Sequence, residues 1–226
     1  MTEIPKNEEH QWAAGLDRIR KAIESRTPEQ IRQIEQETAE RNESIKQGHI
    51  HQLRQDAGIP VRHLQCAPGL DGDWAKKLEL LSGKLGTGFT AVLIGVRGTG
   101  KTQMAVEIVK AATGRMMTCR FITAVGFFME IKKTYRKEAD DSEVDILQRY
   151  RRPKLLVIDE IGKRSDSDWE NSLLFELLNK RYNDMTDTLL IDNRSKADFS
   201  SAIGPSLASR INESGGIIEC NWESFR

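Results

Sequence analysis

The chain has 226 residues, enough for one medium domain with an appendage or for two small domains, and enough to bury a sizeable core. Its 34 basic and 34 acidic residues cancel, so the protein as a whole exerts no general attraction on nucleic acid or membranes. Three widely separated cysteines argue against a disulfide framework and for a reducing compartment. Because the sequence has neither an apolar leader nor a membrane-spanning stretch, we expect a soluble, cytoplasmic protein.

The first part of the chain predicts two helices. In residues 8–25 apolar side chains recur at spacings of four, three and four, as on one face of an amphipathic helix: Trp12, Leu16, Ile19 and Ile23. Thr27, Pro28 and Gln30 then form a capping-box pattern, which predicts a second helix that ends near Gln55. This second helix carries few apolar residues, so the two helices alone cannot form much of a core.

We therefore divide the chain into a small N-terminal all-α region, residues 1–57, and a main domain, residues 58–226. The N-terminal region either packs on the main domain, dimerises or binds a partner, or remains a solvated charged arm. Four possible zinc ligands lie near the boundary: His49, His51, His63 and Cys66. Their spacing lacks the paired C-x₂₋₄-C ligands of known zinc sites, so we expect hydrogen-bonded or solvated histidines rather than metal ligands.

The main domain alternates between helical and strand-like segments. Helical periodicity is found in residues 73–85, 101–112, 124–136, 141–150, 168–183 and most of 196–213. The strand-like segments are residues 90–94, 116–123, 155–159, 188–192 and 216–220. Strands that are apolar throughout and alternate with helices predict a parallel sheet that helices cover on both faces.

A nucleotide-binding motif joins the first of these strands to the following helix. Eight residues match the pattern G-x-x-x-x-G-K-[ST] of a phosphate-binding P-loop: Gly95, Val96, Arg97, Gly98, Thr99, Gly100, Lys101 and Thr102. In such a loop the glycines let backbone N–H groups surround phosphate oxygens, Lys101 neutralises phosphate charge, and the hydroxyl of Thr102 can bind Mg²⁺. The motif therefore predicts a site for ATP or ADP with Mg²⁺.

An acidic motif ends the strand at residues 155–159. Four apolar residues lead to Asp159 and Glu160, which is the pattern of a Walker B strand. We expect Asp159 to hold Mg²⁺ and Glu160 to polarise the attacking water. We also expect this strand to lie next to the P-loop strand.

Two further polar residues are candidates for contacts with the γ-phosphate. Asn193 follows the strand at residues 188–192, where an asparagine either forms a turn or helix cap or orients the hydrolytic water. Arg210 lies near the end of the last predicted helix. A cation there either stabilises the helix end or reaches the nucleotide of a neighbouring subunit as an arginine finger.

Taken in order, these motifs and the ending N-W-E-S-F-R resemble the AAA+ ATPases of the DnaC/DnaI helicase-loader family, which are related to the IstB transposition ATPases. The resemblance extends from about Gly58 to Arg226. It implies an α/β fold, an AAA+ P-loop core whose parallel sheet is flanked by helices, without a C-terminal lid. It also implies that Asn193 senses the γ-phosphate, that Arg210 acts in trans within a homo-oligomer, and that Arg226 is a second cation at the nucleotide.

The same resemblance implies contacts with single-stranded DNA. In the family such contacts come from a helix after the second strand and from the segment after Walker B. Lys132 and Tyr135 match the first, as a phosphate contact and a stacking platform, and Ser167 and Trp169 match the second. Each of these residues has an alternative interpretation as part of a solvated helix face or as a half-buried ring.

Four functions remain open from the sequence. The resemblance favours an ATP-dependent loader that places a hexameric DnaB-type replicative helicase on single-stranded DNA in a bacterium or phage-infected cell. An IstB-like ATPase that assists a DNA transposase is the main alternative. A small-molecule kinase is disfavoured because Glu160 directly after Asp159 favours water as the phosphoryl acceptor. A passive ATP switch that does not hydrolyse its nucleotide is the fourth possibility.

Overall fold

The structure is a computed structural model that describes residue 20, residues 25–65 and residues 72–225. The chain divides between Gly48 and His49 into two units, each of which is described by itself. Most of the predicted helix at residues 8–25 lies outside the described residues, as do Cys66 and Arg226. Across the part of the chain that is described, no helix is long and apolar enough to cross a membrane.

Helix α2 (Pro28–Asp56) confirms the second predicted helix. The backbone N–H of Thr27 donates to Gln30 Oε1 (2.9 Å), and the N–H of Gln30 donates to Thr27 Oγ1 (3.3 Å). These reciprocal bonds are the capping box that the sequence predicts. The first part of α2 leaves three apolar side chains exposed to solvent: Ile31, Ile34 and Ile45.

The last turns of α2 belong to the second unit. Ile50 is buried, and Arg120 donates from Nη1 to the carbonyl oxygen of Asp56 (3.0 Å). The compact unit therefore begins at His49 rather than after residue 57. The functional division at residue 57 stays a prediction.

The second unit is built on a five-stranded sheet in which all neighbouring strands are parallel, in the order β2-β3-β4-β1-β5. Its strands are β1 (Thr90–Ile94), β2 (Cys119–Thr123), β3 (Leu155–Asp159), β4 (Asp187–Ile191) and β5 (Gly216–Glu219). Its further helices are α3 (Val61–Leu64), α4 (Gly72–Gly83), α5 (Lys101–Gly114), α6 (Ala124–Lys133), α7 (Glu143–Arg151), η1 (Ile161–Lys163), α8 (Asp168–Asn183), α9 (Lys196–Ile203) and α10 (Pro205–Ser214). This architecture confirms the predicted α/β fold with a parallel sheet.

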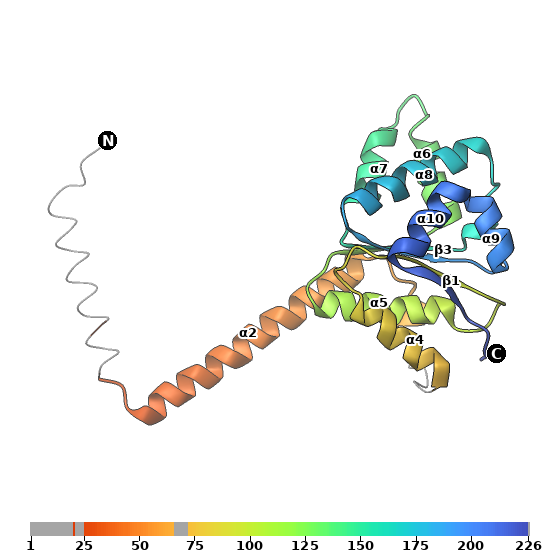
Figure 1. Cartoon of the computed structure of the whole chain (residues 1–226). Helices are drawn as coiled ribbons and strands as arrows, with labels where there is room; N and C mark the ends of the chain where they lie inside the picture. Colours follow the sequence, from red (N-terminus) through yellow and green to blue (C-terminus); the bar gives the residue numbers. More distant parts are fainter. Residues whose placement is uncertain (1–19, 21–24, 66–71, 226) are drawn as a thin grey trace. The chain divides into compact units, whose positions relative to one another are not determined.

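Helices cover both faces of the sheet (Figure 1). Along β3, Leu155 and Val157 contribute to the core under α4 and α5. Leu156 and Ile158 point to the opposite face, where the core includes residues of α6, α7, α8, α9 and α10. Successive side chains of a strand face opposite ways, so a strand covered on both sides must be apolar throughout.

The predicted contact between β3 and the P-loop strand β1 is wrong. Strand β4 lies between them, because Leu189 pairs with Ala91 of β1 on one side and with Val157 of β3 on the other. All three strands are continuous apolar runs, and such runs contain no signal for their lateral order. As a consequence, Asn193 follows a strand that lies between β1, which leads into the P-loop, and β3, which ends in Asp159.

The last predicted helix, residues 196–213, is two helices. Gly204 separates α9 from α10 and has a φ of +80°, a conformation that favours glycine. Pro205 follows at the first position of α10, where its missing N–H costs no hydrogen bond. The helical periodicity continues across this break, which is why the pattern alone suggests a single helix.

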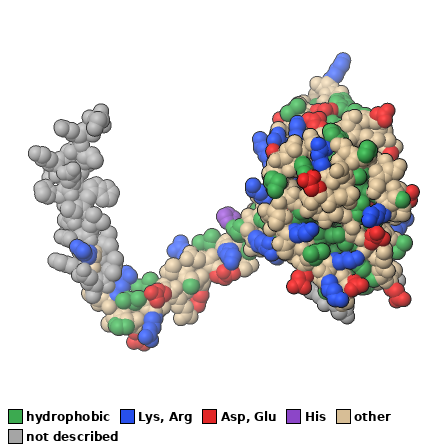
Figure 2. All heavy atoms as spheres, in the orientation of Figure 1, with side chains coloured by type: hydrophobic (Ala, Val, Ile, Leu, Met, Phe, Trp, Pro, Cys, Tyr) green, Lys and Arg blue, Asp and Glu red, His purple; other side chains and the backbone are tan. Residues whose placement is uncertain are grey.

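The surface of the second unit carries charges of both signs. On the face drawn in Figure 2, basic and acidic side chains are interspersed. This mixture agrees with the equal numbers of basic and acidic residues in the chain. Long-range attraction of nucleic acid by this face is therefore weak, and a contact with DNA has to come from a local cluster.

Candidate functional site

The P-loop connects β1 to α5 and uses glycine where the backbone requires it. Gly98 and Gly100 have φ angles of +92° and +74°, in the left-handed region. A Cβ on Gly95 would lie 2.7 Å from the carbonyl oxygen of Cys220, so only glycine fits there. Helix α5 has no side-chain cap at its N-terminus, which leaves the first N–H groups of the helix available to an anion.

Lys101 is held inside the loop. Its side chain is 5% exposed, and Nζ donates to the carbonyl oxygens of Gly95 and Val96, both at 2.7 Å. Burial lowers the pKa of Lys101, and the nearby Cys220, Asp159 and Asp192 partly oppose this shift. A desolvated cation beside the uncapped end of a helix binds phosphate more strongly than an exposed lysine does.

Thr102 and Asp159 meet across two elements. The hydroxyl of Thr102 donates to Asp159 Oδ2 (2.8 Å), and the N–H of Glu160 donates to Asp159 Oδ1 (2.6 Å). Burial raises the pKa of Asp159, and these two hydrogen bonds partly offset that increase. A hydroxyl and a carboxylate are hard oxygen donors, the type that Mg²⁺ prefers, so the pair fits the predicted metal.

Glu160 lies directly after β3 in a strained conformation. Its φ of +58° lies in the left-handed region, where a residue other than glycine is strained. Such strained residues are concentrated at functional sites. The carboxylate forms an ion pair with Lys163 of η1. Asp159 accepts hydrogen bonds from Thr102 and from the N–H of Glu160, whereas Glu160 pairs with Lys163, so the two adjacent acids can serve different roles.

Most of the predicted nucleotide and catalytic residues meet at a cavity of about 720 Å³. Eight of them line it: Arg97, Gly98, Gly100, Lys101, Thr102, Asp159, Glu160 and Asn193. A neighbouring hollow of about 500 Å³ shares several of the same residues: Arg97, Glu160, Lys163 and Asn193. These volumes are in the range of ligand sites in proteins.

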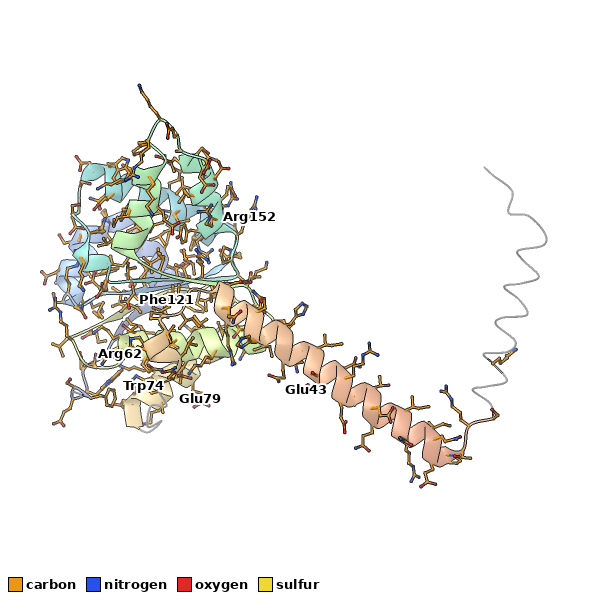
Figure 3. The ribbon with its side chains drawn as sticks, turned by 180° about the vertical axis from the view of Figure 1, so that it is seen from behind. Glu43, Arg62, Trp74, Glu79, Phe121 and Arg152 are labelled. Carbon is orange, nitrogen blue, oxygen red and sulfur yellow. The ribbon has the colours of Figure 1, made fainter. Side chains whose placement is uncertain are left out.

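Three aromatic residues to which the motifs assign no role contact carbonyl groups of the P-loop: Trp74, Trp222 and Phe225. Trp222 Nε1 donates to the carbonyl oxygen of Thr99 (2.8 Å), and the N–H of Phe225 donates to that of Gly98 (3.0 Å). Trp74 of α4 lies on the same side of the sheet as Arg62 (Figure 3), and its Nε1 points at the carbonyl oxygen of Gly100 at 3.4 Å. In the sequence, Trp222 and Phe225 are noted only as part of the ending that resembles the loader family. No neighbouring residue indicates that they contact the P-loop.

The histidines near the boundary form ordinary contacts. His63 Nδ1 lies 2.9 Å from Gln103 Oε1, and Gln103 Nε2 donates to the carbonyl oxygen of His63 (3.1 Å), which links α3 to α5. His51 Nε2 lies 2.9 Å from Gln55 Nε2. Among the described residues, no group of three or more His, Cys, Asp or Glu side chains is arranged to hold a metal ion.

Arg210 lies apart from the cavity of its own chain. Its guanidinium is 5.6 Å from the ring centroids of both Phe175 and Tyr182, and Nη1 donates to Ser206 Oγ (3.1 Å). A cation over two ring faces is attracted by both quadrupoles. The other predicted cation, Arg226, lies outside the described residues.

Three of the predicted DNA-contact residues form one cluster, which we call the α6–α8 aromatic cluster: Lys132, Tyr135 and Trp169, with Phe128 beneath them. Lys132 Nζ lies 5.3 Å from the ring centroid of Trp169, and Trp169 Nε1 donates to Tyr135 OH (3.1 Å). Ser167 has a local role as well, because its hydroxyl accepts a hydrogen bond from the N–H of Glu170 and so caps α8.

Comparison with known proteins identifies relatives of this chain. The model of the family described as IstB-like ATP binding protein matches residues 34–226. The replicative helicase loader DnaC of Escherichia coli (strain K12) is 26% identical over 136 residues, which are 60% of this chain and 55% of that protein. The insertion sequence IS21 putative ATP-binding protein of Pseudomonas aeruginosa is 28% identical over 167 residues, 70% of this chain and 60% of that protein. The chain thus spans little more than half the length of these curated relatives.

A solved structure has the same fold. A crystal structure of the DnaC helicase loader aligns with a TM-score of 0.59 at 20% identity and covers 71% of this chain and 99% of that one. The predicted AAA+ architecture and the resemblance to DnaC-type proteins related to IstB are therefore confirmed. Since the family model extends over most of the sequence, the chain belongs to the family of IstB-like ATP binding proteins.

Proposed function

We propose that the chain is a Mg²⁺-dependent ATPase that loads a hexameric replicative helicase onto single-stranded DNA. The observation that carries the ATPase activity is the convergence of Lys101, Thr102, Asp159, Glu160 and Asn193 on one cavity. The similarity to the E. coli DnaC loader supports the choice of partner. Residues 1–57 are proposed to bind this partner, and a cytoplasmic location stays an expectation.

Each residue of the cavity has a separate proposed task. Lys101 and the N-terminus of α5 bind the phosphates, while Thr102 and Asp159 supply oxygen ligands for the metal. When bound, Mg²⁺ neutralises charge that develops on the phosphoryl oxygens. Glu160 accepts a proton from the attacking water, and Asn193 orients that water. Lys163 pairs with Oε1 of Glu160, so Oε2 is the oxygen that we assign to the proton.

We assign Arg210 as an arginine finger that acts in trans within a homo-oligomer. Its distance from the cavity of its own chain supports this role, because α10 positions the side chain against Phe175 and Tyr182 rather than against the P-loop. The guanidinium would exchange these two rings for the phosphate of a neighbouring subunit. Arg226 is proposed as the second cation at the nucleotide.

The α6–α8 aromatic cluster is the proposed contact for single-stranded DNA. Tyr135 is 58% exposed, so its ring can stack on a base, and the side chains of Lys132 and Ser167 are exposed as well. The hydrogen bond from Trp169 Nε1 to Tyr135 OH fixes the orientation of the Trp169 ring. Such a cluster binds the backbone and stacks on bases without reading their sequence.

An IstB-like ATPase that assists a DNA transposase is the second candidate. The family match and the alignment with the IS21 protein, which is longer than that with DnaC, favour this alternative. The nucleotide site has the same proposed chemistry in both cases, so the partner decides between them.

The partner can be tested by mixing the full chain with either a hexameric replicative helicase or an IS21-type transposase in the presence of ATP and Mg²⁺. We expect a stable complex with the helicase on gel filtration, and ATP turnover that rises when helicase and single-stranded DNA are added. A complex with the transposase alone would overturn the loader assignment in favour of the alternative. Turnover that does not respond to Glu160→Gln would overturn the ATPase assignment.

A further inference from the structure

Donors from outside the P-loop reach three of its consecutive carbonyl groups. The carbonyl oxygen of Gly98 accepts from the N–H of Phe225 at 3.0 Å, and that of Thr99 accepts from Trp222 Nε1 at 2.8 Å. The carbonyl oxygen of Gly100 faces Trp74 Nε1 at 3.4 Å and also accepts the first hydrogen bond of α5. Two of these donors come from the segment after β5 and one from α4, elements far apart in the sequence.

The direction of these carbonyls determines the direction of the N–H groups that a phosphate would meet. A peptide unit is planar and trans, so its C=O and N–H point in opposite directions. Trp222 is not among the residues that line the cavity, whereas Gly100 is. Holding the carbonyl of Thr99 toward Trp222 therefore turns the N–H of Gly100 away from Trp222. The N–H of Phe225 holds the carbonyl of Gly98 in a similar way.

A loop with glycine at two of these positions is not rigid by itself. Gly98 and Gly100 accept many backbone angles, and without outside contacts their peptide planes would rotate. Preorganised donors bind an anion more tightly because less ordering entropy is lost on binding. The indole of Trp222 makes the shorter of the two indole contacts, and its side chain is half-buried in the folded unit.

We propose that Trp222 is a positioning residue for nucleotide binding, whose indole N–H holds the peptide between Thr99 and Gly100 so that its N–H faces the phosphates. This inference rests on the ATP-binding part of the proposed function and is independent of the partner. Trp74 and Phe225 assist on the neighbouring peptides. The segment after β5 thereby acts as a brace on the P-loop.

The test uses the full chain with Trp222→Phe, which keeps an aromatic ring but removes the N–H donor together with part of the indole's contact area. Lys77→Met is the matched control, because Lys77 Nζ lies 5.1 Å from the ring centroid of Trp222 and contacts no P-loop carbonyl. Calorimetric titration with the non-hydrolysable analogue AMPPCP and Mg²⁺ measures affinity, and thermal unfolding without nucleotide measures stability. We expect the Kd of Trp222→Phe to rise about fivefold, the value of one neutral hydrogen bond, and Trp74→Phe to have a smaller effect.

The control variant should bind within about twofold of the parent, and the unliganded Tm of Trp222→Phe should fall by no more than about 4 °C, the value of one hydrogen bond in a chain of this size. An unchanged Kd in Trp222→Phe, or an equal loss in Lys77→Met, would overturn the inference, since the ring rather than its N–H would then matter. Failure of the parent chain to bind AMPPCP would instead contradict the proposed function.

A second measurement needs no variant. In ¹⁵N-labelled parent chain, solvent exchange of the Trp222 indole proton should slow when AMPPCP and Mg²⁺ are added, because phosphates that bind the inner N–H groups fix the outer hydrogen bond as well. An exchange rate that does not change on saturation with AMPPCP would overturn the proposal even if Trp222→Phe failed to fold.

Discussion

The nucleotide site and the α6–α8 aromatic cluster differ in how their polar groups are held. At the nucleotide site Lys101 and Asp159 are 5% and 6% exposed. Carbonyl groups of the P-loop fix Lys101, and the N–H of Glu160 and the hydroxyl of Thr102 fix Asp159. In the aromatic cluster Tyr135 is 58% exposed, and its hydroxyl accepts from Trp169 and donates to Glu143. Desolvated groups in fixed positions interact strongly with a ligand, whereas exposed groups interact weakly and in a salt-dependent manner.

This comparison predicts that substitutions have large, sharply localised effects at the nucleotide site and small, distributed effects in the cluster. Buried polar groups that lose a partner cost more than exposed ones because water cannot replace the lost contact. If the cluster binds single-stranded DNA as proposed, losing one member should cost less than losing a buried nucleotide contact, since stacking and phosphate contacts would be shared among several side chains.

The largest effect is expected for Glu160→Gln. Removing the proton acceptor should lower kcat for ATP hydrolysis by about a thousandfold, while the Kd for ATP stays within about twofold of the parent. A single-turnover assay and equilibrium titration separate the two quantities. Glu176→Gln, which removes an exposed carboxylate paired with Lys180, serves as the control. Equal losses in affinity and turnover would show that Glu160 binds the nucleotide instead.

Lys101→Met should weaken nucleotide binding by about a hundredfold, since it removes a buried charge-assisted contact with the phosphates. Lys110→Met on the same helix is the control, because Lys110 pairs with Glu107 and lies on a different turn of α5. Fluorescence titration with a labelled ATP analogue measures both. Similar Kd values for the two variants would mean that the cavity does not bind phosphate at the P-loop.

Trp169→Ala should reduce affinity for single-stranded DNA by about tenfold, in line with the loss of one stacked base. Lys132→Ala should have a smaller effect and lower the salt dependence of binding by about one unit of slope. Leu80→Ala, an exposed apolar residue on α4, is the control on another surface. Fluorescence anisotropy with an oligonucleotide at several salt concentrations measures all three. Retention of full affinity in the Trp169 and Lys132 variants would remove the cluster from the DNA-contact proposal.

The smallest expected effect concerns stability. Burial raises the pKa of Asp159, so the folded chain favours the neutral acid, and stability falls as pH rises through the raised pKa. Without nucleotide or Mg²⁺, Asp159→Asn should therefore raise Tm by a few degrees at neutral pH, with no difference below the ordinary pKa of aspartate, about 4. Melting curves at several pH values measure this. A lower Tm for the variant at neutral pH would contradict the expectation.

Local motifs determined much of the fold and the nucleotide site in advance. The P-loop glycines specify a backbone conformation that other residues rarely adopt, and β1, β3 and α8 occur with the predicted limits. The capping box at Thr27 likewise needs only residues three positions apart. Such features are readable because the interactions that stabilise them lie within a few residues of each other.

Other features were decided only by the tertiary structure. The insertion of β4 between β1 and β3 depends on packing among strands that are equally apolar, and the indole of Trp222 meets Thr99 from the far end of the chain. The same holds for Arg210, whose rings come from α8. Sequence pattern determines conformation along the backbone, whereas contacts between distant segments follow from how the whole core is filled, and no local pattern encodes that choice.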